Sequence, residues 1–209
     1  MPDDAVQEDT GRPRAVPRFA TPSLAEMTDA QREIYALFTT GPRAAGAAFS
    51  LAGEEGQLAG PPAVWLLSPP VGLALEKVGR AVRFQLEVPP RAREIVILMT
   101  GHHHASPFEI YAHSRGGLAA GLSPADLDAL AAGQPPALAD DTERAAYAAT
   151  REILADGTLS HDSYRAAVTV LTERGLFEVV ALIGWYSMLA VQLAVFGVQP
   201  PGAAGHDEQ

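Results

Sequence analysis

The chain has 209 residues, of which 15 are lysine or arginine and 25 are aspartate or glutamate, so its formal net charge is −10. So acidic a chain lacks the basic surface that nucleic acids and anionic membranes attract, and we expect neither as a partner. The absence of cysteine excludes disulfides, thiolate catalysis and cysteine-based metal sites, and it suits a reducing cytoplasm.

Helix start and stop signals divide the chain into consecutive helices, and no segment shows the alternating pattern of a strand. We expect a flexible arm at residues 1–22, one helical domain at 23–198 and a flexible tail at 199–209, with a glycine- and alanine-rich loop at 42–62. The expected helices cover residues 28–41, 63–68, 71–84, 90–104, 106–121, 123–133, 140–157, 160–175 and 176–197. This pattern predicts a single-domain, all-α helical bundle.

The segment Val179–Val198 contains no charged residue and is long enough to cross a bilayer. Against a membrane span, it contains Tyr186 and Gln192, and Arg174 is the nearest basic flank. We therefore expect a buried helix and no membrane association. One small domain cannot easily cover a helix that is apolar on every side, so we also expect a homo-oligomer.

Residues that can carry chemistry gather between positions 93 and 121. Glu94 shares a helical face with Gly101 in an otherwise apolar helix, which makes it a candidate buried carboxylate for proton transfer. The alternative is an ion pair between Glu94 and a nearby arginine, such as Arg91 or Arg115. The sequence does not separate these two interpretations.

Glu109 and His113 stand four residues apart on the next helix, so their side chains meet on one face. A carboxylate beside an imidazole is a common acid/base pairing. The alternative is a capping box, in which Glu109 bonds back to the amide of Ser106 while His113 is a satisfied core residue. Spacing alone favours this alternative, because E-x-x-x-H pairs are common.

Three consecutive histidines, His102 to His104, invite a metal interpretation. Consecutive helical residues point about 100° apart and cannot converge on one ion, so we expect no metal and expect one of these rings to line a pocket. The chain has none of the common nucleotide-binding motifs, so we expect no cofactor.

The order of these segments resembles the carboxymuconolactone decarboxylase family, which shares its fold with alkyl hydroperoxide reductase D. The likeness spans Leu24–Val198. It rests on GPR at 41–43, LEKVGRAVRF at 75–84, R-x-R-E at 91–94, FEIYAH at 108–113, AAGLSPADLDAL at 119–130 and GWYSMLAV at 184–191.

In the peroxidase branch of that family, a glutamate and a histidine fall on Glu94 and His113, and two cysteines fall on Ser106 and Glu109. Thiol peroxidase activity is not expected here, because its disulfide chemistry needs both thiols. The decarboxylase branch carries an E-x-x-x-H segment and is the closer likeness. It implies an alkyl hydroperoxide reductase D-like bundle, a trimer or hexamer, that acts without a cofactor on a small carboxylated lactone or related acid.

The resemblance, with the chemistry of such a substrate, assigns roles to individual side chains. His113 would donate a proton, and Glu109 or Glu94 would orient and tune it. The substrate-binding candidates are Arg43, Arg83, Arg115, Tyr186, His104 and Ser106. Two alternatives stay open, a related isomerase or lactone hydrolase and a non-catalytic module that binds a small acid.

Overall fold

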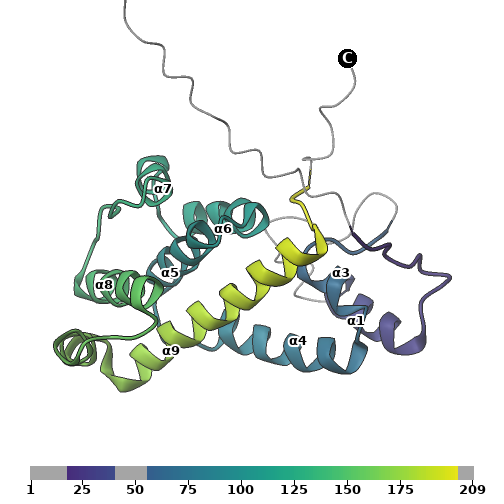
Figure 1. The fold of residues 1–209 in the computed structure, drawn as a ribbon, viewed down its shortest axis with the longest axis horizontal. Helices are drawn as coiled ribbons and strands as arrows, with labels where there is room; N and C mark the ends of the chain where they lie inside the picture. The colour runs from purple at the N-terminus through teal and green to yellow at the C-terminus, as the bar shows by residue number, and fades with distance from the viewer. Residues whose placement is uncertain (1–17, 41–55, 202–209) are drawn as a thin grey trace, which may run out of the picture.

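A computed structural model describes residues 18–40 and 56–201 of the chain (Figure 1). These residues form eight helices and no strand. The helices are α1 (Asp29–Thr39), α3 (Pro61–Trp65), α4 (Pro69–Phe84), α5 (Pro90–His103), α6 (Pro107–Ala119), α7 (Pro124–Ala131), α8 (Asp141–Asp156) and α9 (His161–Phe196). The predicted all-α class is confirmed, and most of the predicted loop at 42–62 lies outside the described residues.

The helices begin and end at local signals in the sequence. Thr28 and Ser123 each close a capping box, and proline occupies the first turn of the five helices from α3 to α7. Proline fits there because the first helical N–H groups have no partner within the helix. Gly157 ends α8 with a φ of 73°, a conformation that glycine adopts without strain.

The break in the C-terminal helix lies earlier than predicted. The sequence predicts two helices that meet at Gly175, whereas the non-helical residue within α9 is Thr172, with φ 65° and ψ 169°. The Thr172 hydroxyl accepts a hydrogen bond from the Gly175 N–H at 3.3 Å, so Thr172 acts as the N-cap of the second half of α9. Gly175 therefore belongs to a first turn and does not end a helix.

The α9 helix is the central helix of the fold and packs against α3, α4, α5, α6 and α8 (Figure 1). By length and composition α9 could cross a bilayer, yet 44% of its apolar window is buried in this fold. Leu182 and Leu189 lie on the buried face, whereas Phe177 is 70% exposed on the other side. The α9 helix is thus a core helix with one uncovered apolar face.

Two residues of the predicted N-terminal arm contact the end of α9. The Arg18 N–H donates to the Phe196 carbonyl at 3.1 Å, and the rings of Phe19 and Phe196 meet edge to face at 5.5 Å. These contacts hold residues 18 and 19 against the helical body, and the boundary at residue 23 stays a prediction.

Gly60 caps α3 at a point where no side chain fits. Its φ of 68° and ψ of −155° are nearly restricted to glycine, and an added Cβ would lie 2.3 Å from Cζ of the buried Phe108 ring. We expect Gly60→Ala to lower the free energy of unfolding by about 3 kcal/mol, through overpacking and backbone strain.

Gly157→Ala is the matched control for this prediction. Gly157 also has a positive φ, but no heavy atom lies within 4 Å of its missing Cβ, so the loss there should be about 1 kcal/mol. Urea unfolding of both variants measures the difference. Equal losses would contradict the role given to the Phe108 contact.

Candidate active site

The helices α5 and α6 form a tight hairpin that carries the predicted site. The corner between them is closed by a hydrogen bond from the Ser106 N–H to the Gly101 carbonyl, at 2.9 Å. A Cβ on Gly101 would lie 3.4 Å from the Glu109 Cβ, so the two helices approach closely at this glycine. Side chains of α5 and α6 can therefore meet directly.

The structure brings Glu94, Glu109 and His113 together. His113 Nδ1 lies 2.7 Å from Glu94 Oε2, and His113 Nε2 lies 3.6 Å from Glu109 Oε2. All three residues are buried, with relative exposures of 7%, 3% and 7%. Because a carboxylate only accepts hydrogen bonds, Nδ1 donates to Glu94 and Nε2 is left facing Glu109.

Neither of the two arginines named for the ion-pair alternative contacts Glu94, although a third nearby arginine, Arg93, does. Arg91 pairs with Glu143 instead, and Arg115 donates to the Tyr111 carbonyl at 3.0 Å. The partners of Glu94 are His113 and, more distantly, Arg93, whose Nε lies 3.9 Å from Oε1.

Gly116 also shapes this position, although none of the candidate site residues predicted from the sequence was a glycine. A Cβ there would lie 2.9 Å from Glu94 Oε2, so only glycine leaves room for the carboxylate. The signal was the Gly116–Gly117 pair inside a helical pattern, since a glycine within a helix often marks close packing.

The capping-box alternative for Glu109 is also wrong. A capping box needs the Ser106 N–H, which already donates to Gly101, and the Ser106 side chain makes no capping bond. The Ser106 hydroxyl is buried and has no hydrogen-bond partner in the structure as described. Glu109 is therefore free to turn its carboxylate toward His113.

The ring of Tyr186, on α9, packs against one side of the His113 ring. Its ring lies 4.8 Å from the His113 ring and meets it at 84°, and the residue is 4% exposed. Burial, followed by the charge of Glu109, raises the Tyr186 pKa above its usual value. Tyr186 is thus a neutral phenol at physiological pH and can act as a hydrogen-bond donor.

Arg83, at the end of α4, is the predicted substrate-binding arginine whose charge affects the buried side chains of this centre. Its positive charge lowers the pKa of both Glu109 and Tyr186, against the larger opposing effect of burial. The guanidinium is exposed and has the ring of Phe84 at 5.8 Å. It therefore offers a cation beside the buried acid and phenol.

The other substrate-binding candidates either contact neighbouring side chains of their own segment or lie outside the described residues. Arg115 stacks on Tyr111 with its guanidinium carbon 3.7 Å from the ring centroid, so it is engaged on its own helix. His104 ends α5 and lies edge to face against His103, at 5.0 Å. Arg43 lies outside the described residues.

His102 and His103 line a pocket, as predicted for at least one of the three histidines. Among residues 18–40 and 56–201, no group of three or more histidine, aspartate or glutamate side chains is arranged to hold a metal ion.

Burial raises the pKa of Glu109, and the charges of His113 and Arg83 oppose that rise. Because the folded-state pKa lies above the unfolded value, protonation of Glu109 favours folding. This stability is fully present below the unfolded pKa, about 4.5, and is lost as the pH rises through the folded pKa.

We therefore expect Glu109→Gln to raise the melting temperature at pH 7 and to flatten its decline with pH. The amide has the shape of the carboxylic acid and carries no charge to bury. Calorimetry of both proteins between pH 4 and pH 8 checks this, and an unchanged pH slope would contradict it.

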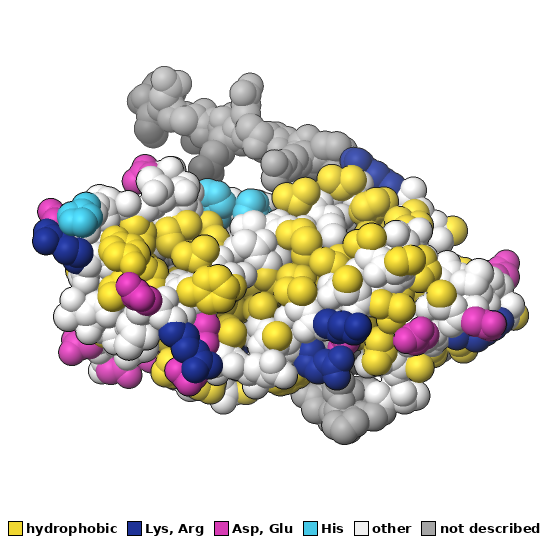
Figure 2. Space-filling model, turned by 90° about the horizontal axis from the view of Figure 1, so that it is seen from below, with side chains coloured by type: hydrophobic (Ala, Val, Ile, Leu, Met, Phe, Trp, Pro, Cys, Tyr) yellow, Lys and Arg dark blue, Asp and Glu magenta, His cyan; other side chains and the backbone are white. Residues whose placement is uncertain are grey.

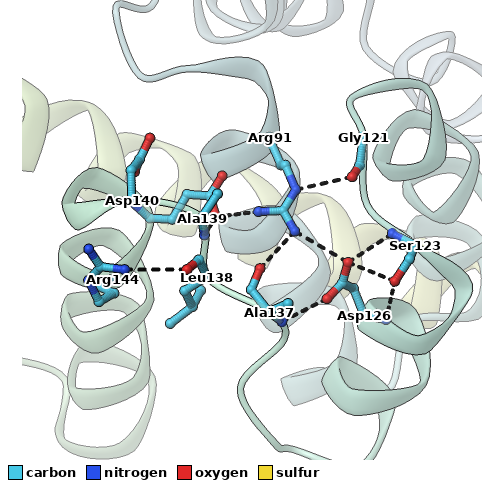
Figure 3. Close-up of polar contacts among 10 residues, drawn as sticks. Arg91, Gly121, Ser123, Asp126, Ala137, Leu138, Ala139, Asp140 and Arg144 are labelled. Carbon is cyan, nitrogen blue, oxygen red and sulfur yellow. Dashed lines mark hydrogen bonds and ion pairs between the residues drawn. The ribbon is translucent and has the colours of Figure 1, made fainter.

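Arg91, at the start of α5, connects this helix to four other segments of the chain (Figure 3). It pairs with Glu143 of α8, and its Nη2 lies 3.2 Å from Asp126 Oδ2 of α7. It also donates to the carbonyls of Ala137, at 2.8 Å, and Gly121, at 3.2 Å. The network ties α5, which carries Glu94, to the α6–α7 turn, α7, the α7–α8 connection and α8.

The sequence model of the carboxymuconolactone decarboxylase family matches residues 69–152, from the first residue of α4 into α8. This segment contains Glu94, Glu109 and His113, while Tyr186 lies beyond it. No curated protein matches the chain. Residues 69–152 of the chain are thus similar to the carboxymuconolactone decarboxylase family.

Proposed function

We propose that this protein is a cofactor-independent decarboxylase that acts on a small carboxylated lactone or a related acid. The carrying observation is one buried imidazole, His113, held at Nδ1 by Glu94 and facing Glu109 at Nε2. The similarity of residues 69–152 to the carboxymuconolactone decarboxylase family supports the same chemistry, and a chain without cysteine cannot be a thiol peroxidase. The compartment we propose is the cytoplasm.

The reaction begins when the bond between the ring carbon and its carboxylate breaks and leaves the electron pair on the ring carbon. In a γ-carboxylated unsaturated lactone, loss of CO₂ leaves the electron pair on carbon, delocalised as an enolate onto the lactone carbonyl oxygen. Protonated His113 then transfers its Nε2 proton to carbon, while Glu94 stabilises the imidazolium through Nδ1. Glu109, whose pKa is raised, supplies the next proton to Nε2. One CO₂ leaves and one proton is taken up, so no oxidant or reductant is needed.

Three further groups would bind the substrate. The exposed guanidinium of Arg83 would hold the carboxylate before it leaves, and the neutral Tyr186 phenol would donate to the enolate oxygen. The unpartnered Ser106 hydroxyl offers one more donor or acceptor. The apolar surroundings favour decarboxylation because CO₂ is neutral and the carboxylate is not.

The test is CO₂ release from a panel of small carboxylated lactones, with carboxyl-labelled substrates and His113→Gln as the inactive control. Labelled CO₂ formed by the wild-type protein supports the proposal. A shifted ring double bond without CO₂ would indicate the isomerase, and ring opening without CO₂ the hydrolase. Saturable binding without turnover would indicate the non-catalytic module.

We further propose that the protein is a homo-oligomer, a trimer or hexamer. Exposed apolar side chains follow the open side of α9 at helical spacing: Phe177, Val180, Val191 and Val195. More apolar side chains spread over the face seen from the side of α4 (Figure 2). Contact with further copies would remove these surfaces from water.

We expect sedimentation velocity at micromolar concentration to show an assembly, and Phe177→Asp to dissociate it. Asp128→Asn, which changes charge at an exposed position of α7, away from α9, is the control and should leave the assembly intact. A folded wild-type monomer of 22.0 kDa would contradict the proposal.

A further inference from the structure

A second pocket lies between α5, α7 and α8. Its volume is about 460 Å³, a size that suits a small molecule. Met99, Leu130 and Leu154 give it an apolar lining. Beneath it lies the smaller of the two hydrophobic clusters of the fold, which includes Leu98 and Leu130.

This pocket is separate from the Glu94–His113 centre. The α5 helix turns Glu94 and Gly101 toward α6, where they meet His113 and Glu109. Met99, His102 and His103 leave the same helix in other directions and line the pocket. The proposed catalytic residues do not line it, so the two sites use different faces of α5.

The pocket contains a cation that makes no salt bridge to any described residue. Arg151 lines it one helical turn after Tyr147, and within residues 18–40 and 56–201 no carboxylate forms an ion pair with the Arg151 guanidinium. The adjacent Glu152 accepts hydrogen bonds from Ser160 and Ser163, which lower its pKa, and the Arg151 charge lowers that pKa further without a direct contact.

Arg151 is one of the few arginines without a salt bridge in the described part of a chain whose net charge is −10. Most arginines in the described part form ion pairs, as Arg144 does with Asp141 at 2.7 Å. An unpaired guanidinium over an apolar lining complements a ligand with one anionic end and one apolar end.

We propose that this pocket binds a small aromatic carboxylic acid, with its carboxylate on Arg151 and Tyr147 and its ring on Met99, Leu130 and Leu154. Arginine matches a carboxylate through two parallel hydrogen bonds, and the Tyr147 hydroxyl can add a third. The thioether of Met99 is a favourable neighbour for an aromatic ring. Burial lowers the pKa of His102, so its imidazole is neutral at pH 7 and serves as a hydrogen-bond partner.

Benzoate is the probe, and the Met99 methyl group is the reporter. The chain has four methionines, so a ¹³C-methyl-methionine spectrum of the full chain is simple, and Met99→Leu identifies the Met99 signal. We expect benzoate to shift this signal saturably. Benzamide, which has the same shape without the charge, should bind at least about tenfold more weakly.

Two arginine variants on α8 test the contact. Arg151→Gln should weaken benzoate binding about tenfold or more, while Arg144→Gln, on the same helix but engaged with Asp141, should leave it unchanged. Circular dichroism establishes that both variants are folded.

Two outcomes of the benzoate titration would overturn the proposal. A Met99 signal that does not move with benzoate, or that moves equally in Arg151→Gln, would end it. His113→Gln should leave benzoate binding at Met99 unchanged, and a loss there would place benzoate in the Glu94–His113 centre instead. Because this readout needs no turnover, its outcome is independent of the proposed decarboxylation.

Discussion

Replacing His113 with glutamine is expected to lower the rate of CO₂ release about 100-fold or more while the fold is retained. Glutamine reaches toward Glu109 from the position of Nε2, but its amide neither gains nor gives a proton at neutral pH. His113→Asn is the complementary variant, because its amide can keep the hydrogen bond that Nδ1 donates to Glu94. Both should be inactive if the transferred proton resides on the imidazole.

The accompanying variants separate catalysis from packing. His161→Gln makes the same chemical change at the exposed first residue of α9 and should keep full activity. Glu94→Gln and Glu109→Gln should each lose activity, and adding His113→Gln to either should cost little more, because groups that act as one unit are not additive. Full activity in His113→Gln would refute the assignment of the proton donor.

Short-range spacing predicted much of this site. The four-residue interval places Glu109 and His113 on one face of α6, and the helical wheel places Glu94 on the face of α5 that carries Gly101. The 2.7 Å contact between Glu94 and His113 depends on how closely the two helices pack, and Gly101 and Gly116 allow that approach. A helical wheel shows the direction of a side chain but not the distance between two helices.

Long-range contacts explain why some predictions from the sequence were wrong. Ser106 and Glu109 have the residue types of a capping box, but the Gly101 carbonyl takes the amide that the box requires. Arg91 stands three residues before Glu94, yet its acidic partners come from α7 and α8. No local pattern reveals such partners, because the fold brings them together.

The helix boundaries, by contrast, are local features of the chain. Thr28, Ser123, Asp140 and Ser160 cap the helices they were predicted to open. The predicted position of the break in α9 was wrong because a glycine usually marks the end of a helix. Here Thr172 caps the second half of α9, and Gly175 lies in the first turn of that half.

The largest loss of stability is expected for Arg91→Met. The side chains of Arg91, Asp126 and Glu143 are 17%, 7% and 6% exposed, so removal of the arginine leaves two carboxylates without their cation in a poorly solvated place. Breaking a buried ion pair in this way costs about 3–5 kcal/mol of unfolding free energy. Methionine preserves much of the apolar stem, so the loss reports on the charge more than on packing.

Two comparisons make the result specific. Arg144→Met removes an ion pair whose side chains are 52% and 80% exposed, and it should cost less than about 1 kcal/mol. Adding Glu143→Gln to Arg91→Met should recover part of the loss, because the amide oxygen can still accept the Ala139 N–H that now bonds Glu143. A fully additive double variant would mean that Arg91 and Glu143 are not coupled.

The pH dependence of unfolding tests the same network from its acidic side. Hydrogen bonds from the Ser123 and Ala137 amides lower the pKa of Asp126, and the Arg91 charge lowers it further. A depressed folded pKa contributes stability above the unfolded value, about 3.8, and this stability is lost as the pH falls through the folded pKa. In Arg91→Met the backbone donors to Asp126 remain but the cation is gone, so the Asp126 pKa is lowered less. Protonation of Asp126 therefore removes less unfolding free energy from the variant. Unfolding free energies measured between pH 7 and pH 3 should therefore fall less steeply in the variant, and an equal slope would show that Arg91 does not act on Asp126 through its charge.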